Sequence, residues 1–337
     1  MKGARLFPAL LVAAAVLGFL PRAAVGLDTA TYSTGWVPLP RDMGFFVARD
    51  KGWYRAAGLD IKLIRGYGGG AVAKDLAAGT IEFGHADPRS VILIRSQGGD
   101  LRTIGVIHAE SVFTIFALKG SGIAKPKDLE GRTVGAAPGE AAFVNLPVLA
   151  AVNRVDFAKI RHVPLQPPAS IPSLVAGKVD AITLFTISLP IVQQVAAKQG
   201  KEVVSIPYSE HGLDIYSIGV ATRDRVIREK RSLVQRFIQD SMKGTAWAVE
   251  HSDEALEIFH KSVPAAGREV SREGWKITVK HLLTPEAKEH GIGYMTREKW
   301  ERTLGAVRKT TPEDLSRVAV TDLYTNEFLP RLIPKAP

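Results

Sequence analysis

Hydrophobic and polar positions alternate between two patterns from Asp28 onward. Short runs rich in β-branched and aromatic residues predict strands, and the segments between them have the spacing of amphipathic helices. This alternation is typical of βα units around a mainly parallel sheet. The first block predicts strands at residues 28–33, 60–64, 81–84, 103–108 and 111–118, with helices at residues 39–51, 71–78 and 88–97.

The same layout begins again near residue 132. This second block predicts strands at residues 132–136, 161–164, 179–185, 202–206 and 216–222, with helices at residues 140–152, 170–176 and 189–199. Beyond Asp224 the pattern changes to charged amphipathic helices without strands between them, at residues 225–251 and 271–283. We expect these helices to cover a sheet that is built earlier in the chain.

Two successive βα blocks predict an α/β protein with two lobes. We place the first lobe at residues 27–117, the second at residues 118–215, and a return to the first lobe with the C-terminal helices at residues 216–337. The extended runs at residues 111–118 and 216–222 fall where the chain would cross between the lobes. A pair of crossing strands suggests a hinged clamp around a ligand.

The first 26 residues have the pattern of a secretory signal peptide. Lys2 and Arg5 precede an apolar run at residues 6–20, and Ala24-Val25-Gly26 has the small-x-small form of a cleavage site. The run is shorter than the roughly 20 residues that a membrane-spanning helix needs. We therefore expect cleavage near Gly26 and export to a bacterial periplasm.

Composition narrows the function classes. The 337 residues include no cysteine, which excludes disulfide bonds, thiolate metal sites, a cysteine nucleophile and a lipid attached through cysteine. The formal charge is +10, but Lys2, Arg5 and Arg22 lie in the predicted signal peptide and the other basic residues form no dense run. We expect no nucleic-acid partner, because such proteins concentrate their basic residues in a stripe or helix.

Candidate binding residues gather at the predicted carboxyl ends of strands, where open α/β sheets bind ligands. The glycine-rich turn at residues 66–70 follows a strand and opens a helix, but it lacks the dinucleotide spacing, so we expect no cofactor there. Two roles for this turn remain open: it contacts a group of the ligand, or it is a tight turn with no part in binding. We predict a pocket for a small, partly planar molecule, with the ligand-binding residues Ser33, Trp36, Tyr67, Gly68, Gly69, His85, Asp87, Pro138, Gly139, Glu140, Phe185 and Thr186.

Motifs for catalysis or metal binding are weak. His85 and Asp87 have a spacing that suits two metal ligands, but no third ligand is near, and Asp87 before Pro88 is more typical of a helix cap. The sequence has neither the G-x-S-x-G nor the H-E-x-x-H motif of hydrolases. We predict no catalytic residue and no metal. An exported enzyme acting on a small heterocycle is the alternative of another class, with Asp87 or Glu140 as its base.

Ordered motifs over about residues 28–249 resemble a known family. They read G-F-F-V-A at residues 44–48, K-G-W-Y at 51–54, A-G-L-D at 57–60, A-G-T-I-E-F-G at 78–84, L-K-G-S-G-I at 118–123, K-D-L-E-G-R-T-V-G at 127–135 and A-G-K-V-D-A at 176–181. These motifs resemble the extracytoplasmic solute-binding proteins of ABC importers in the nitrate/taurine class, and they are most like the thiamine-pyrimidine-synthesis-like branch.

The resemblance implies a two-lobed type II periplasmic-binding-protein fold with a helical C-terminal extension on the first lobe. It implies a monomeric receptor that closes over one small ligand and delivers it to the membrane permease subunits of an importer, or that senses the ligand for a signalling partner. The eukaryotic pyrimidine synthases of the family carry a lysine and a histidine at the positions that correspond to Ala86 and Ser90 of this chain. Their pyridoxal-phosphate chemistry therefore does not transfer.

The candidate residues point to two kinds of ligand. Three aromatic side chains (Trp36, Tyr67 and Phe185) disfavour nitrate, since a small inorganic anion needs donors more than ring faces. Asp87 and Glu140 would accept hydrogen bonds from ring amino groups, which favours a pyrimidine-like heterocycle. Two cations, Arg41 and Arg89, favour an anion such as an alkanesulfonate or an aromatic carboxylate.

Overall fold

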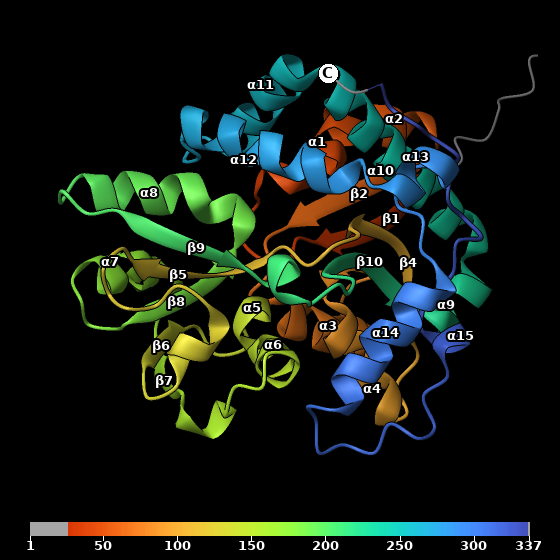
Figure 1. Ribbon diagram of the computed structural model, residues 1–337. Helices are drawn as coiled ribbons and strands as arrows, with labels where there is room; N and C mark the ends of the chain where they lie inside the picture. The colour runs from red at the N-terminus through yellow and green to blue at the C-terminus, as the bar shows by residue number, and fades with distance from the viewer. Residues whose placement is uncertain (1–25, 336–337) are drawn as a thin grey trace, which may run out of the picture.

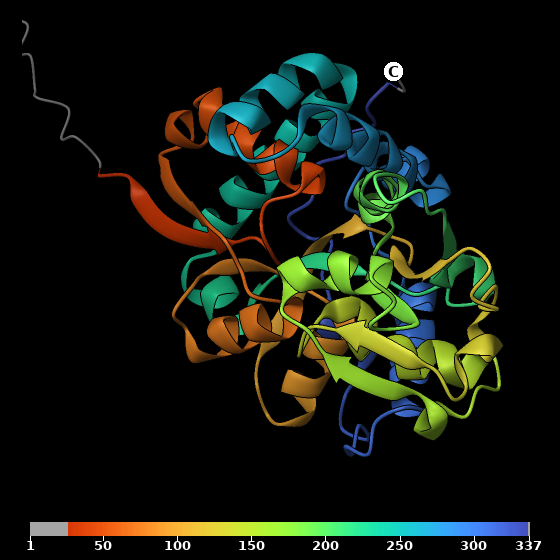
Figure 2. The same ribbon diagram turned by 90° about the vertical axis from the view of Figure 1, so that its left-hand side faces the viewer.

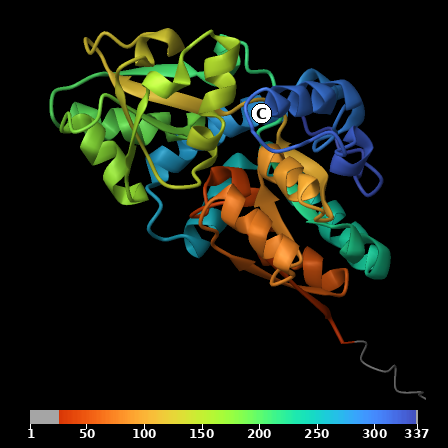
Figure 3. The ribbon, with the colours of Figure 1, turned by 90° about the horizontal axis from the view of Figure 1, so that it is seen from below.

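The computed structural model describes residues 26–335 (Figure 1). The predicted signal peptide, apart from Gly26, lies outside the described residues. Two five-stranded sheets, each with helices on both faces, form two lobes, so the predicted two-lobed α/β fold is confirmed. In Figure 3 the yellow and green second lobe lies beside the first lobe, which combines the orange N-terminal part with the teal and blue C-terminal helices.

The first sheet has the strand order β2-β1-β3-β10-β4. In this sheet β1 pairs in parallel with β2 and β3, and β10 runs antiparallel to both of its neighbours. Its strands are β1 (Asp28–Ser33), β2 (Leu59–Ile64), β3 (Phe83–Ala86), β4 (Leu101–His108) and β10 (Ile218–Arg223).

The second sheet has the order β7-β6-β8-β5-β9, in which β5 runs antiparallel to β8 and β9. Its strands are β5 (Phe113–Leu118), β6 (Thr133–Ala136), β7 (Arg161–Pro164), β8 (Ala181–Phe185) and β9 (Val203–Pro207). Each sheet thus contains a reversed strand, where the sequence predicted mainly parallel sheets. The reversed strands β5 and β10 begin just after a crossing between lobes, so they start at the edge where their neighbours end.

Helices sandwich the first sheet, as Figure 2 shows for the red strand β1 between teal helices above and orange helices below. The core on one face includes two ring stacks, Tyr32 on Phe45 at 4.2 Å and Phe83 on Phe237 at 4.0 Å between centroids. That face carries η1 (Pro40–Asp42), α1 (Met43–Asp50), α2 (Trp53–Ala56), α9 (Asp224–Glu229), α10 (Arg231–Glu250), α11 (Ser252–Ser262), α12 (Arg268–Leu282) and α13 (Pro285–His290). The opposite face carries α3 (Gly69–Ala78), α4 (Pro88–Ser96), α14 (Arg297–Arg308) and α15 (Val320–Leu323).

The second sheet is covered in the same manner by shorter elements. One face packs against α5 (Ala141–Val144) and α6 (Leu146–Val152), and the other against α7 (Ser170–Val175) and α8 (Leu189–Ala197). The remaining turns are the 3-10 helices η2 (Pro126–Leu129), η3 (Phe157–Lys159), η4 (Pro167–Ala169), η5 (Thr186–Ser188) and η6 (Tyr208–His211).

Two element predictions need correction. The chain crosses between the lobes at residues 109–112 and 208–217, so the runs predicted as crossing strands belong mostly to β5 and β10 within the sheets. The predicted single helix at residues 225–251 is interrupted at Lys230, whose φ of −128° and ψ of 40° leave helical geometry and separate α9 from α10.

In both lobes, an acidic side chain from one of the family-like motifs accepts hydrogen bonds from a neighbouring strand. Oε2 of Glu82, just before β3, accepts a hydrogen bond from the backbone N–H of Thr31 in β1 at 2.9 Å. Oδ2 of Asp180, just before β8, accepts from the backbone N–H of Thr133 in β6 at 2.7 Å and from its hydroxyl at 2.6 Å. These two acids therefore have the same structural role in their lobes.

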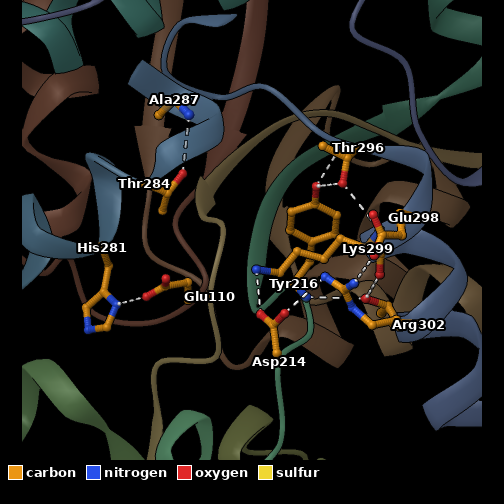
Figure 4. A network of polar contacts seen from close by, with 11 residues as sticks. Glu110, Asp214, Tyr216, His281, Thr284, Ala287, Thr296, Glu298, Lys299 and Arg302 are labelled. Atoms are coloured by element: carbon orange, nitrogen blue, oxygen red, sulfur yellow. Dashed lines mark hydrogen bonds and ion pairs between the residues drawn. The ribbon is translucent and has the colours of Figure 1, made fainter. Parts of the chain in front are cut away.

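At each crossing between the lobes, an acidic side chain contacts polar or charged side chains of a C-terminal helix (Figure 4). At the first crossing, Oε2 of Glu110 lies 3.1 Å from Nδ1 of His281 in α12. At the second, the carboxylate of Asp214 lies 2.6 Å from Nζ of Lys299 and 3.0 Å from a guanidinium nitrogen of Arg302, both in α14. Because α12 also contacts η5 and α8 of the second lobe, the C-terminal helices join the two lobes.

The close crossing of α1 and α10 generates a stability prediction. A Cβ added at Gly244 would lie 2.0 Å from the backbone oxygen of Gly44, which cannot move aside without shifting a helix. We expect Gly244→Ala to lower the free energy of unfolding by about 3 kcal/mol, measured by urea denaturation. The control is Gly305→Ala in α14, where an added Cβ meets nothing within 4 Å. That variant should be stabilised by about 0.5–1 kcal/mol, and equal stability of the two variants would contradict the packing argument.

Buried histidine at the first crossing generates a pH prediction. The side chain of His108, at the end of β4, is fully buried, and burial, with smaller contributions from Arg41 and His281, holds its pKa well below the usual 6.5. Unfolding exposes a histidine that takes up a proton, so stability is lost as the pH falls below 6.5. Between pH 7.5 and 5.5 this one group should cost about 1.4 kcal/mol.

The test compares the pH dependence of stability between variants. His108→Leu should lose less stability than the parent chain over that pH interval, whereas replacing the exposed His290 by glutamine should leave the difference unchanged. Parallel pH profiles for the parent chain and His108→Leu would show that His108 does not titrate in this way.

Candidate functional site

A cavity of about 180 Å³ lies between the two lobes at the carboxyl ends of their strands. This volume corresponds to about six water molecules at liquid density, which is room for a small ring system. The first lobe contributes Gly35, Trp36, Val37, Leu39, Arg41, Gly68, Gly69, His85, Ala86, Asp87 and Ile218. The second lobe contributes Ala137, Glu140, Ala141, Pro167, Ser170, Ile171, Leu184, Phe185 and Ser188. Most of the wall is therefore apolar or aromatic, with a few polar groups set into it.

Two glycine-containing turns bring the lobes together beside the cavity. The backbone N–H of Gly68 donates to the oxygen of Gly35 at 2.9 Å, which holds the 66–70 turn against the loop that carries Trp36. Gly68 has a φ of +114°, and a Cβ there would meet the backbone oxygen of Gly139 in the second lobe at 3.1 Å. A side chain at position 68 would thus be strained and would also press against the other lobe.

A buried pair of side chains stands at one wall. Nδ1 of His85 in β3 lies 3.0 Å from Oδ1 of Asp42, whose other oxygen accepts the backbone N–H of Leu39 at 2.7 Å. Burial lowers the pKa of His85 more than Asp42 raises it, so the imidazole is neutral near pH 7. Asp42 thereby orients the ring, and Nε2 of His85 has no hydrogen-bond partner among the described residues.

The guanidinium of Arg41 is the charged group most deeply set in the cavity wall. Its side chain is 1% exposed, and none of its three nitrogens has a hydrogen-bond partner in residues 26–335. Its Cζ lies 4.3 Å from the ring centroid of Phe185, which comes from the second lobe. Burial lowers the pKa of Arg41, and Asp42 opposes that change.

Two carboxyl groups of the wall have different environments. Asp87 caps α4, as the sequence predicted, because its oxygens accept the backbone N–H of Ser90 at 3.0 Å and the Ser90 hydroxyl at 2.7 Å. Glu140 has only a long contact of 3.4 Å, from the hydroxyl of Thr183, and its Oε1 has no partner among the described residues. Burial raises the pKa of Glu140 well above its usual range, which favours the protonated form.

The structure places the predicted site residues in three groups. Seven of the predicted positions line the cavity: Trp36, Gly68, Gly69, His85, Asp87, Glu140 and Phe185. Tyr67 and Pro138 line an outer hollow that shares Trp36, Val37, Ala137 and Pro167 with the cavity, and Gly139 faces Gly68 across the lobes. Ser33 and Thr186 lie outside the cavity lining: the Ser33 hydroxyl donates to the Thr34 oxygen, and the Thr186 hydroxyl lies 2.8 Å from that of Thr114.

Other cavity residues were not among the predicted site residues. Arg41 was considered only for its charge, and Asp42 lay in a segment predicted as the start of a helix. A charged pair between Pro40 and the apolar start of α1 is the sequence signal that marks them. The apolar residues Ile171 and Leu184 carry no such signal, because they look like ordinary core positions.

Two kinds of feature are absent from the described residues. No group of three or more histidine, aspartate or glutamate side chains in residues 26–335 is arranged to hold a metal ion. No helix in the same part of the chain is long and apolar enough to cross a membrane.

Proteins with similar sequences include two named for binding. The riboflavin-binding protein RibY of Chloroflexus aurantiacus is 23% identical over 327 residues, covering 92% of this chain and 88% of that protein. The formylaminopyrimidine-binding protein of Halalkalibacterium halodurans is 23% identical over 290 residues, covering 82% of this chain and 84% of that protein. A 4-amino-5-hydroxymethyl-2-methylpyrimidine phosphate synthase of Saccharomyces cerevisiae is 25% identical over 109 residues, or 32% of each chain.

Solved structures share the fold. A Bordetella bronchiseptica protein superposes with a TM-score of 0.73 at 16% identity, covering 89% of this chain and 95% of that chain. The alkanesulfonate-binding protein SsuA of Xanthomonas axonopodis, solved with MOPS, superposes with a TM-score of 0.65 at 16% identity, covering 90% and 99%. The predicted periplasmic-binding-protein fold is thus confirmed.

The family comparison agrees with the motifs. The family described as NMT1/THI5 like matches residues 40–255, which include the cavity residues from Arg41 to Ile218 but not the four that precede residue 40. The predicted resemblance to the thiamine-pyrimidine-synthesis-like branch is therefore confirmed, and the chain belongs to the NMT1/THI5-like family.

Proposed function

We propose that this chain is the substrate-binding component of an ABC import system that captures a small planar organic ligand, with a pyrimidine-like heterocycle as the favoured class. The observation that carries the proposal is a mostly apolar cavity, walled by both lobes, with a few buried polar groups aimed at one small molecule. The names of the two relatives that cover most of the chain, which refer to riboflavin and a formylaminopyrimidine, support a nitrogen heterocycle.

Closure of the two lobes over the ligand follows from the fact that both lobes contribute residues to the cavity wall. Trp36 belongs to the first lobe and Phe185 to the second, so a flat ligand between them contacts both lobes only when the lobes are together. A ligand that binds the closed form better shifts the population toward it. The membrane permease subunits of the importer would then recognise the closed face.

The location and assembly belong to the same proposal. The chain would act in the periplasm as a monomer, after removal of the predicted signal peptide near Gly26. Its partners would be the ligand and the permease subunits, and not nucleic acid.

Catalysis is the second candidate because His85 and Asp42 form a buried pair of the kind that orients a general base. Against it, Asp87 is occupied in capping α4, where it accepts the hydroxyl of Ser90, and Ala86 has no group for chemistry. Incubating the protein with each ligand that binds and following the ligand by mass spectrometry separates the two functions. Recovery of unchanged ligand after many hours is expected, and turnover would favour the enzyme.

Ligand binding is the first prediction of this function. In a thermal-shift screen of the chain from Leu27 onward, we expect pyrimidine-like heterocycles or flavins to raise the melting temperature by a few degrees. At a hundredfold excess over Kd the ligand adds about 2.7 kcal/mol to the free energy of unfolding. Nitrate should give no shift, since it leaves the aromatic walls uncovered. No shift with any organic ring compound would contradict the receptor role.

The second prediction concerns the contact between the ligand and the aromatic side chain of Trp36. Trp36→Ala should weaken binding of a ligand found in the screen about 10- to 100-fold in a calorimetric titration, because it removes one face of the sandwich. The matched control is Tyr67→Ala, since Tyr67 is 68% exposed and lines only the outer hollow. Equal loss in both variants would place the ligand outside the cavity.

A further inference from the structure

The guanidinium of Arg41 is the feature of the molecule that most needs a partner. Its Nε, Nη1 and Nη2 are all buried, and none makes a hydrogen bond within residues 26–335. Arginine stays protonated under any condition a protein meets, so the charge cannot be removed by losing a proton. Buried guanidinium donors without acceptors are costly, which favours an occupant that supplies an anionic acceptor.

Nearby carboxyl groups are already in use. Asp42 influences the charge of Arg41, but its oxygens face the N–H of Leu39 and Nδ1 of His85. Asp87 accepts both hydrogen bonds that Ser90 offers at the start of α4. Across the cavity, burial raises the pKa of Glu140, which favours its protonated form. No described carboxylate therefore makes a hydrogen bond to the guanidinium of Arg41, although Asp42 lies near enough to influence its charge.

The ring of Phe185 sets the orientation of the guanidinium. The Cζ of Arg41 lies 4.3 Å from the ring centroid, so one flat face of the cation is covered from the second lobe. The N–H donors of an arginine point along the edges of its plane, where two parallel N–H groups match the two oxygens of a carboxylate. The N–H donors of Arg41 are left without acceptors, at a cavity whose walls are mostly apolar or aromatic.

We propose that the ligand is a planar ring bearing a carboxylate, and that this carboxylate pairs with Arg41, which makes Arg41 the residue that selects the acid over its uncharged analogues. This inference rests on the proposed receptor function and refines its ligand class. The ring lies against Trp36 and Phe185, and the unpaired Oε1 side of Glu140 faces a polar atom on the ring. A neutral heterocycle fills the same walls but offers the guanidinium of Arg41 no charged acceptor. A sulfonate carries the charge but brings a third oxygen, which needs room and a hydrogen-bond donor that mostly apolar walls do not supply.

The experiment uses matched probes that differ in one group. Pyridine-3-carboxylate and pyridine-3-carboxamide, pyrimidine-5-carboxylate and its amide, and benzoate and benzenesulfonate are titrated calorimetrically into the chain from Leu27 onward at pH 7.5. We expect each carboxylate to bind at least 100-fold more tightly than its amide, and benzoate more tightly than benzenesulfonate. Amides that bind as tightly as acids, or a sulfonate that binds as tightly as the carboxylate, overturn the assignment.

Two substitutions at Arg41 test its part in the selection. Arg41→Met removes the charge and should abolish the preference for the acid over its amide, whereas Arg41→Lys keeps the charge without the fork and should retain only a small preference. The matched control is Arg65→Met, because Arg65 is exposed and lies over Tyr67 in the outer hollow. A preference that survives Arg41→Met overturns the inference, and circular dichroism melting establishes that each variant is folded.

The outcomes separate the two proposals. Binding of the uncharged rings alone overturns the carboxylate inference and leaves the receptor function intact. If none of the ring compounds, including the heterocycles and flavins of the thermal screen, binds the parent chain, both proposals are wrong. The ligand pairs on the parent chain decide the question even if an Arg41 variant does not fold.

Discussion

The arrangement of the two lobes depends on side-chain contacts at the two segments where the chain crosses between them. Both crossings are short, and each has an acidic residue that contacts a C-terminal helix: Glu110 meets His281 of α12, and Asp214 meets Lys299 of α14. Lys299 is only 4% exposed, whereas the side chain of Asp214 is 56% exposed, so this ion pair joins a buried cation to an acid at the surface. The helices that follow the second βα block thereby fix the hinge, and the cavity exists because the two sheets end opposite each other at that hinge.

Much of this arrangement follows from local rules that a sequence displays. Apolar runs between helical segments predicted the ten strands within a few residues, and Asp87 before Pro88 predicted the cap of α4. Reversal of β5 and β10 was not predictable, since strand direction depends on which lobe the chain has just left. The break at Lys230 also has no breaker residue to mark it, because the adjoining residues of α9 and α10 all suit a helix.

The candidate site also has some residues that the sequence predicted and others that it did not. Residues at strand ends and in the 66–70 turn were found from the sequence because open α/β sheets present those positions to a ligand. Arg41 was not, since its role depends on Phe185, which folding brings over its guanidinium from the other lobe. Ser33 and Thr186 sit next to the right positions, yet their hydroxyls turn into the protein and bond to Thr34 and Thr114. Adjacent residues at a strand end point in opposite directions, so a shift of one position along the chain decides whether a side chain reaches the cavity.

The contacts across the cavity explain why binding and closure are one event. Gly68 approaches Gly139 so closely that a Cβ on the first would touch the second, and Arg41 reaches the ring of Phe185 from the opposite lobe. Opening the hinge would separate both pairs. With the carboxylate ligand inferred above, the anion would meet Arg41 inside the closed cavity, so that binding and closure would favour each other.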